Sequence, residues 1–242
     1  QAIPRGLRRP RLCRRHAMFV GCHLVPVIAL CGADDTGNCK MTSERDRAAA
    51  ARAGGPILTA SSLLFVALIT NHPTAGSGLF LHQGIHGLLM LMILTMTAGF
   101  LLFVLWRRSL LAAIGLVPFA AGAIAAFGAG TINGFIAPSL VTQGIASYGD
   151  LLWTSNQVLA SIGIVATAAA FSLWSLDLWR LGWRITAALG LLAGMLPAML
   201  LLSGRIDMHI TGAMIAYSAN AIWALWLGVV LIRKAFKREE RQ

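Results

Sequence analysis

Six long apolar runs, separated by short polar breaks, follow one another along most of the chain. Each run, as a helix rising about 1.5 Å per residue, is long enough to cross roughly 30 Å of hydrocarbon, the first and fifth only just. Helices are the expected form, because unpaired backbone groups in lipid are costly and the runs lack the alternation of barrel strands. The runs cover approximately residues 56–69, 78–106, 110–136, 151–176, 185–202 and 210–232.

The composition agrees with a membrane protein. Hydrophobic residues make up 57% of the 242 residues and charged residues only 12%, and the mean hydropathy is +0.72. A soluble domain carries about 25% charged residues and about 45–50% apolar ones. We therefore predict an all-α, polytopic integral membrane bundle of six transmembrane helices.

The net charge of +11 follows the pattern of a membrane topology signal, not of a nucleic-acid-binding face. About half of the basic residues lie in the first 52 positions, and most of the others flank the apolar runs. One set of run ends carries Arg45, Arg47, Arg52, Arg107, Arg108, Arg180, Arg184, Arg233, Lys234, Lys237, Arg238 and Arg241. The opposite set carries Arg205 alone. Because cytoplasmic loops are rich in Lys and Arg, we expect both termini in the cytoplasm and a bacterial-type plasma (inner) membrane as the location.

The chain divides into four parts. Residues 1–40 form a basic and apolar extension with all four cysteines, 41–55 a cytoplasmic leader, 56–232 the transmembrane domain and 233–242 a basic cytoplasmic tail. The extension has three interpretations: sequence upstream of a true start at Met41, a signal-like segment or extra anchor, or an ordered extension. We favour the first, because Met41 opens an ordinary cytoplasmic leader. The cysteine spacing fits no standard zinc pattern.

Small residues recur every four positions on two of the runs. Gly122, Ala126 and Gly130 do so on the third run, and Gly190 and Gly194 on the fifth. Small side chains at this spacing let helix backbones approach closely, so we expect these faces to contact other helices.

Two histidines interrupt the second run near its start. His82 and His86 are four residues apart and therefore share one helix face. His209 opens the sixth run on the same predicted outer side, and His72 lies in the first outer loop. Polar side chains within a membrane usually face a bundle interior or a water-filled cavity, which makes them candidates for function.

Other polar residues gather in the same outer half of the bundle, whereas the inner halves are apolar up to their Arg-rich ends. They are Asn133 in the third run, Asn156 and Gln157 in the fourth, and Tyr217 and Asn220 in the sixth. We predict that they line a polar pocket open to the outside. The simpler interpretation is a set of interhelical hydrogen bonds, each contributing about 1 kcal/mol.

Three functions compete for this pocket. A b-type haem would take imidazole ligands from two helices, most plausibly His86 and His209. A divalent metal would bind His82 and His86, with His209 or His72 as a third ligand. A small ligand or a transported solute is the third hypothesis. The lack of Asp or Glu within any run counts against a metal site and against proton-coupled transport.

The sequence contains no hydrolase, nucleophile-elbow or nucleotide-binding motif, so an enzyme acting on its own is the less favoured interpretation. We expect a pocket that binds haem, a divalent metal or a small ligand through His82, His86 and His209. The alternative is a structural or accessory subunit, or a small-solute transporter. The expected partners are the lipid bilayer and either other membrane subunits or a second copy of the chain, but not nucleic acid.

Overall fold

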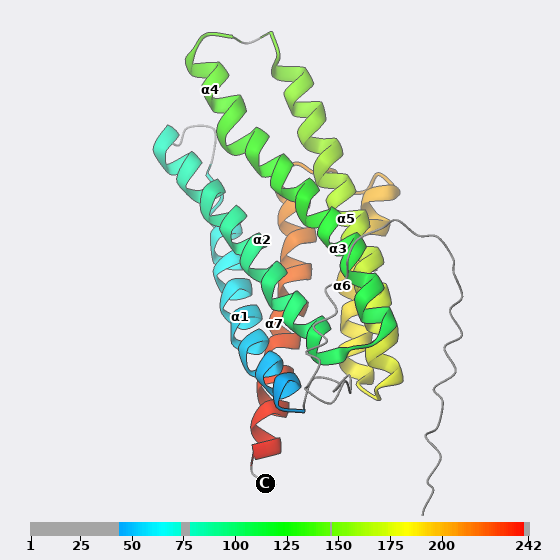
Figure 1. The fold of residues 1–242 in the computed structure, drawn as a ribbon. Helices are drawn as coiled ribbons and strands as arrows, with labels where there is room; N and C mark the ends of the chain where they lie inside the picture. The colour runs from blue at the N-terminus through cyan, green and yellow to red at the C-terminus, as the bar shows by residue number, and fades with distance from the viewer. Residues whose placement is uncertain (1–43, 74–77, 146, 240–242) are drawn as a thin grey trace, which may run out of the picture. The chain divides into compact units, whose positions relative to one another are not determined.

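The computed structural model describes residues 44–73, 78–145 and 147–239, and within them all regular structure is helical, without strands. Six helices are long and apolar enough to cross a membrane, which confirms the predicted helical class and the number of candidate spans. The predicted 1–40 extension lies outside the described residues. The elements are α1 (Glu44–Thr70), α2 (Leu79–Arg107), α3 (Leu110–Thr131), the π-helical segment η1 (Ile132–Ile136), α4 (Ala137–Thr142), α5 (Gly149–Arg180), α6 (Arg184–Leu202) and α7 (Ile210–Glu239) (Figure 1).

The helix bounds agree closely with some of the predicted runs and extend beyond others. Those of α2 and α6 almost coincide with the second and fifth runs. By contrast, α1 begins at Glu44, so most of the predicted leader is helical, and α7 continues into the predicted tail. The third run continues through η1 into α4, as one candidate span of residues 110–142.

Successive long helices run in opposite directions, which gives the bundle two distinct ends (Figure 1). We call one the basic end; it holds the start of α1, the α2–α3 turn, the α5–α6 turn and the end of α7. We call the other the histidine end; it holds the α1–α2, α4–α5 and α6–α7 connections. Of the basic residues that we assigned to one side of the membrane, the following lie at the basic end: Arg47, Arg52, Arg107, Arg108, Arg180, Arg184, Arg233 and Lys234. Arg205 lies at the histidine end, and Arg241 lies outside the described residues.

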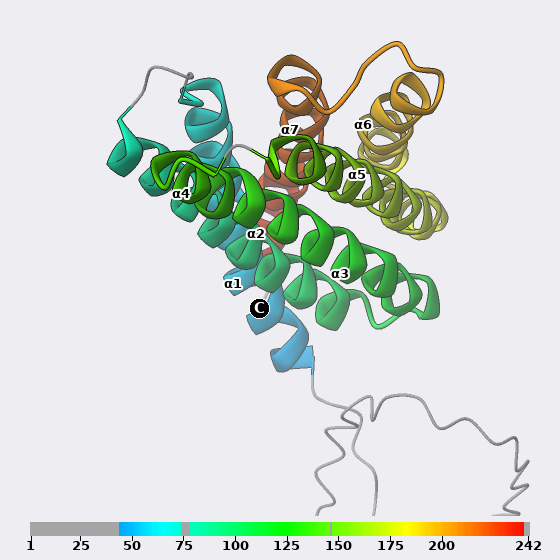
Figure 2. The same cartoon turned by 90° about the horizontal axis from the view of Figure 1, so that it is seen from above.

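Close helix contacts form where the small residues recur. The most extensive contacts join α3 to α5, and α1 to both α7 and α2 (Figure 2). A Cβ added to Gly122 would lie 2.9 Å from the carbonyl oxygen of Gly163, and one added to Gly190 would lie 2.6 Å from the Trp223 ring. A Cβ added to Gly194 would lie 2.9 Å from the Cβ of Phe171. These contacts confirm that the small faces of the third and fifth runs pack on other helices.

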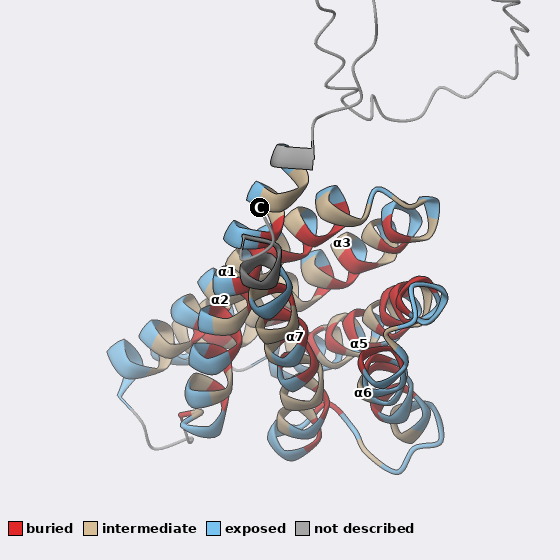
Figure 3. Cartoon of the chain, turned by 90° about the horizontal axis from the view of Figure 1, so that it is seen from below, coloured by how far each residue is buried: buried red, intermediate tan, exposed pale blue. Residues whose placement is uncertain are grey.

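Aromatic side chains fill the bundle interior toward the basic end, where the buried residues face one another (Figure 3). The rings of Phe100 and Trp174 stack with centroids 4.7 Å apart, and those of Phe171 and Trp223 are 4.2 Å apart. The buried indoles keep their hydrogen bonds, since Trp174 donates to the Ala112 carbonyl at 3.0 Å and Trp223 donates to that of Thr186 at 3.0 Å. This core separates the histidine end from the basic end.

An ion pair joins α2 to α5 at the basic end. The Arg107 guanidinium donates two hydrogen bonds to the Asp177 carboxylate, from Nε at 2.6 Å and from Nη2 at 2.9 Å. The two side chains are only 12% and 5% exposed. We expected the fourth span to end at residue 176, just before this acidic residue. Because α5 continues to Arg180, Asp177 lies within the helix and is buried.

Candidate functional site

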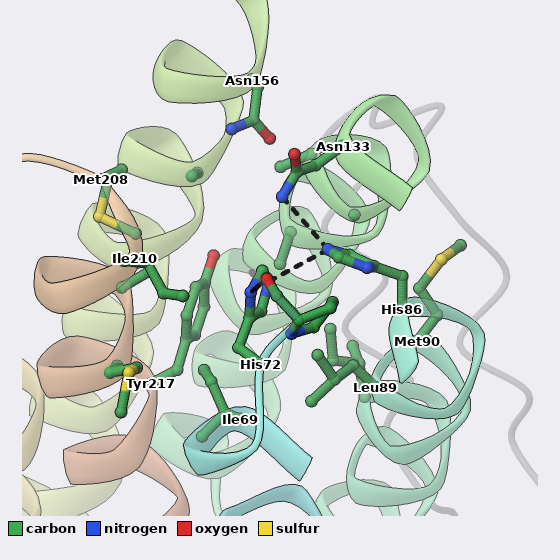
Figure 4. Close-up of a pocket in the computed structure, with 18 of the residues that line it drawn as sticks. Ile69, His72, His86, Leu89, Met90, Asn133, Asn156, Met208, Ile210 and Tyr217 are labelled. Atoms are coloured by element: carbon green, nitrogen blue, oxygen red, sulfur yellow. Dashed lines mark hydrogen bonds between the residues drawn. The ribbon is translucent and has the colours of Figure 1, made fainter. Parts of the chain in front are cut away.

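A cavity of about 350 Å³ lies at the histidine end, between α1, α2, α3, α5 and α7. Most of its wall is apolar, and its polar groups are imidazoles, amides, an indole and a phenol. Figure 4 shows His72, His86, Asn133, Asn156 and Tyr217 among the side chains around it. The polar lining residues are His72, His82, His86, Asn133, Trp153, Asn156 and Tyr217. The apolar ones are Phe65, Ile69, Pro73, Leu89, Met90, Ile93, Ala126, Ala129, Gly130, Ala160, Met208, Ile210, Ala213 and Met214.

Helical spacing on α2 places His82 and His86 on the face that meets the cavity. Their rings stack with centroids 4.6 Å apart, and His86 is buried. Nδ1 of His86 lies 2.9 Å from the backbone carbonyl oxygen of His82. A carbonyl only accepts, so Nδ1 carries the proton of the neutral ring and Nε2 keeps its lone pair.

His72 follows the end of α1 and reaches the same place from the α1–α2 loop. Its Nε2 lies 3.2 Å from Nε2 of His86, and the two rings are nearly perpendicular, with centroids 4.8 Å apart. Its Nδ1 lies 3.1 Å from the carbonyl oxygen of Pro73, which it can only meet as a donor. Burial lowers the pKa of the His72 imidazole below its ordinary value of 6.5, and the nearby His82 adds to this, against the hydrogen bond to Pro73.

The π-helical segment η1 brings Asn133 to the histidines. Nδ2 of Asn133 donates to Nε2 of His86 at 3.2 Å, and Nε2 of His82 donates to the Asn133 carbonyl at 3.1 Å. A π-helical turn frees backbone groups from the regular α-helical ladder and occurs often at functional sites. Gly134, the next residue, packs directly on His86, and any side chain there would collide with it. The backbone of η1 therefore fixes both histidines of α2.

Two of the other predicted pocket residues line the cavity and two do not. The buried Asn156 and the partly buried Tyr217 belong to its wall, on α5 and α7. Asn220 instead lines a smaller cavity of about 50 Å³, which shares Tyr217 with the larger one and is also lined by Phe100 and Phe171. Gln157 lines neither cavity.

His209 lies apart from the other histidines of the site. Its side chain is 59% exposed, and its ring lies tilted against that of Trp153 at a centroid distance of 4.6 Å. Its Nε2 is 3.6 Å from Oδ2 of Asp207. It is not among the residues that line the cavity. His82 and His86 thus lie together, as expected from their spacing. The third histidine beside them is His72 and not His209, which was predicted at the site.

His72 was predicted only as an alternative third ligand of a metal. Its one signal in the sequence is a histidine in a short loop next to the histidine-bearing helix. Met90, Met208 and Met214 also line the cavity without having been singled out, because methionine in an apolar run carries no signal of its own.

Among the described residues, no three His, Cys, Asp or Glu side chains are grouped so as to hold a metal ion. No protein-family model, no curated protein and no solved structure matches this chain.

Proposed function

We propose that this protein is a multi-pass plasma-membrane protein that binds a small, mainly apolar molecule carrying one polar group, in a cavity entered from the outer side. The observation that carries this is the cavity of about 350 Å³, whose apolar wall ends in a cluster of histidine and asparagine side chains. A large, mostly apolar pocket with a few convergent polar groups is the usual form of a small-molecule site.

The orientation rests on the distribution of charge. Arg and Lys residues gather at the basic end, where α2, α5 and α7 end, while the histidine end has Arg205. Because positive residues are retained in the cytoplasm, the basic end is the cytoplasmic one and both termini face inward. The cavity then opens to the outside.

The chemistry of the wall defines the ligand. The described lining residues include no Asp, Glu, Lys or Arg, so recognition of the polar group falls to the imidazoles, the amides, the Trp153 indole and the Tyr217 hydroxyl. The methionine, leucine and isoleucine side chains suit an aliphatic or aromatic body, and methionine adapts to several shapes. An amphiphile with one hydroxyl, carbonyl or similar group fits this pattern.

The geometry favours this function over a haem protein and over a transporter. Axial haem ligands lie on opposite sides of a porphyrin. His72 and His86 are in direct contact, and His209 lies outside the cavity wall, so neither pairing leaves a porphyrin between two imidazoles. A transporter needs a path through the bundle, whereas stacked Phe100, Trp174 and Trp223 close it toward the basic end.

Photolabelling of the protein in lipid nanodiscs tests the proposal. The probe is azi-octanol, an aliphatic alcohol with a photoreactive diazirine, and the labelled residues are mapped by mass spectrometry. We expect saturable labelling of Met208 and Tyr217, which line the cavity, and only concentration-proportional labelling of the exposed Leu91. The measurement is made with EDTA present, so that it reports on the organic ligand alone.

Two variants of α3 provide the matched comparison. Ala126 lines the cavity, so Ala126→Phe fills it and should abolish saturable labelling. Ala121 is exposed on the same helix, so Ala121→Phe adds the same bulk outside and should change nothing. Non-saturable labelling of Met208 and Tyr217 in the folded protein, or equal labelling in both variants, would overturn the proposal.

A further inference from the structure

His72 and His86, which we call the histidine pair, make one more hydrogen-bond contact than their two N–H groups can supply. Three contacts each need a proton: Nδ1 of His72 with the Pro73 carbonyl, Nδ1 of His86 with the His82 carbonyl, and the two Nε2 atoms with each other. Two neutral imidazoles bring only two N–H groups, and carbonyls bring none. With both carbonyl bonds made, the two Nε2 atoms lie 3.2 Å apart without a proton between them, although the Asn133 amide donates to that of His86. A cation between the two Nε2 atoms would satisfy both lone pairs.

The arrangement of the two rings also fits a metal ion bound between the two Nε2 atoms. A straight N–H···N bond at this separation would place the ring centroids roughly 5.5 Å apart, whereas two imidazoles converging on an ion about 2.05 Å from each nitrogen would place them roughly 5.0 Å apart. The observed centroid distance is 4.8 Å. The N···N distance of 3.2 Å also matches the roughly 3.3 Å between two nitrogen ligands of one tetrahedral ion.

The neighbouring residues complete part of a coordination sphere. The Asn133 amide already contacts Nε2 of His86 at 3.2 Å, and turning it about its Cβ–Cγ bond replaces its nitrogen by its oxygen. His82 is not a ligand in this arrangement, because its Nε2 donates to the backbone carbonyl of Asn133. Backbone carbonyls that orient the imidazoles through Nδ1 are the usual outer shell of metal-binding histidines.

We infer that His72 and His86 form a binding site for a divalent first-row transition-metal ion, Zn²⁺ or Cu²⁺, with the Asn133 amide oxygen as third ligand and one position open to the cavity. Imidazole nitrogens select such borderline ions over Mg²⁺ and Ca²⁺, which prefer oxygen ligands. Among the described residues, no three His, Cys, Asp or Glu side chains are grouped around one ion. The proposed site does not need such a group, because its third ligand is an amide oxygen. The site does not require the organic ligand.

Metal titration of the full chain in nanodiscs tests the inference. The protein is purified through a tag without histidine, and the four cysteines of residues 1–40 are replaced by serine to remove competing thiolates. We expect one high-affinity Zn²⁺ site by calorimetry, no heat with Mg²⁺, and nitrogen superhyperfine structure from two imidazoles in the electron paramagnetic resonance spectrum of bound Cu²⁺.

Three variants locate the site. His72→Gln and His86→Gln each remove one ligand and should weaken Zn²⁺ binding by at least about tenfold. His209→Gln, an exposed histidine of the same end, should leave the affinity unchanged. His72 lies in a loop, so its replacement provides the answer if the buried His86 variant does not fold.

The outcomes separate this site from the proposed organic ligand. Loss of Zn²⁺ binding in His72→Gln with retained azi-octanol labelling supports the metal site. Failure of the folded protein to bind Zn²⁺ or Cu²⁺, or equal affinity in the His72→Gln and His209→Gln variants, overturns it. Neither result bears on the organic ligand, which is tested separately by azi-octanol labelling of the Ala126→Phe and Ala121→Phe variants.

Discussion

Gly134 lies directly against His86: a Cβ added to this glycine would overlap the Cβ of the histidine and lie 2.7 Å from its Cγ. The contact joins η1 to α2 at the point where His86 meets Asn133. Both contacting backbones belong to helical segments. A side chain at residue 134 would therefore push η1 and α2 apart and displace the histidine cluster. The position of His86 therefore depends on the absence of a side chain at residue 134.

Replacing this glycine should disturb the cluster. We expect Gly134→Ala to lower the free energy of unfolding by about 1–3 kcal/mol, as overpacking of a filled contact does. Thermal unfolding in nanodiscs measures the change. Among the described residues, no atom beyond the chain neighbours and the nearby backbone of α2 lies within 4 Å of a Cβ added to Gly84. Gly84→Ala is therefore the matched control and should not lower the melting temperature. Equal melting temperatures for the two variants would show that the contact has no energetic role.

The lowered pKa of His72 predicts a pH dependence of stability. An imidazole with a lower pKa in the folded than in the unfolded state takes up a proton on unfolding between the two values. Stability is then complete above the ordinary value of 6.5 and falls as the pH drops through 6.5 toward the lowered pKa. We expect the melting temperature, measured with EDTA, to fall over this range.

A variant without this imidazole should lose part of the dependence. In His72→Gln the decrease of the melting temperature on acidification should be smaller than in the parent protein. His209→Gln removes an exposed imidazole and should keep the full decrease. If all three proteins show the same dependence, His72 does not contribute to it.

Removing one charge of the buried ion pair at the basic end should strongly lower the free energy of unfolding. Asp177→Asn leaves the Arg107 guanidinium, whose side chain is 12% exposed, without its counter-charge. The substitution should lower the free energy of unfolding by about 3–5 kcal/mol. The comparison is Asp207→Asn, because the His209–Asp207 pair is 59% and 68% exposed and should contribute no more than about 1 kcal/mol.

A double variant separates the pair from its surroundings. Replacing both partners by apolar residues, Arg107→Met with Asp177→Leu, removes both charges and should recover much of the lost stability. If the double variant is no more stable than Asp177→Asn alone, the loss comes from packing and not from the unpaired guanidinium.

Most of the helical framework could be predicted from the sequence, because hydropathy and flanking arginines both report on a span. The end of α2 is marked by Trp106 and the two arginines after it. The start of α1 was not predicted, since its first turns are charged and Ala-rich. Hydropathy detects the apolar part of a helix, whereas α1 continues beyond that part.

The site could be predicted only where one helix determines it. The spacing of His82 and His86 fixes their shared face whatever the rest of the fold. His72 and His209 both lie at the same end of the bundle, but which one meets His86 depends on the rotation of α7 and the path of the α1–α2 loop. The π-helical turn that presents Asn133 has no sequence signature, so its hydrogen bonds to the two histidines could not be foreseen.

The most direct test of the cavity entered from the outside is the accessibility of a single cysteine in intact cells. In a cysteine-free background, Ala213→Cys places a thiol on the cavity wall, and Leu181→Cys places one in the exposed turn at the basic end. The reagent is a membrane-impermeant, negatively charged methanethiosulfonate. We predict modification of the Ala213→Cys thiol in intact cells and of the Leu181→Cys thiol only after permeabilisation. Modification of the Leu181→Cys thiol alone in intact cells, or protection of the Ala213→Cys thiol in both conditions, would show that the cavity does not open to the outside.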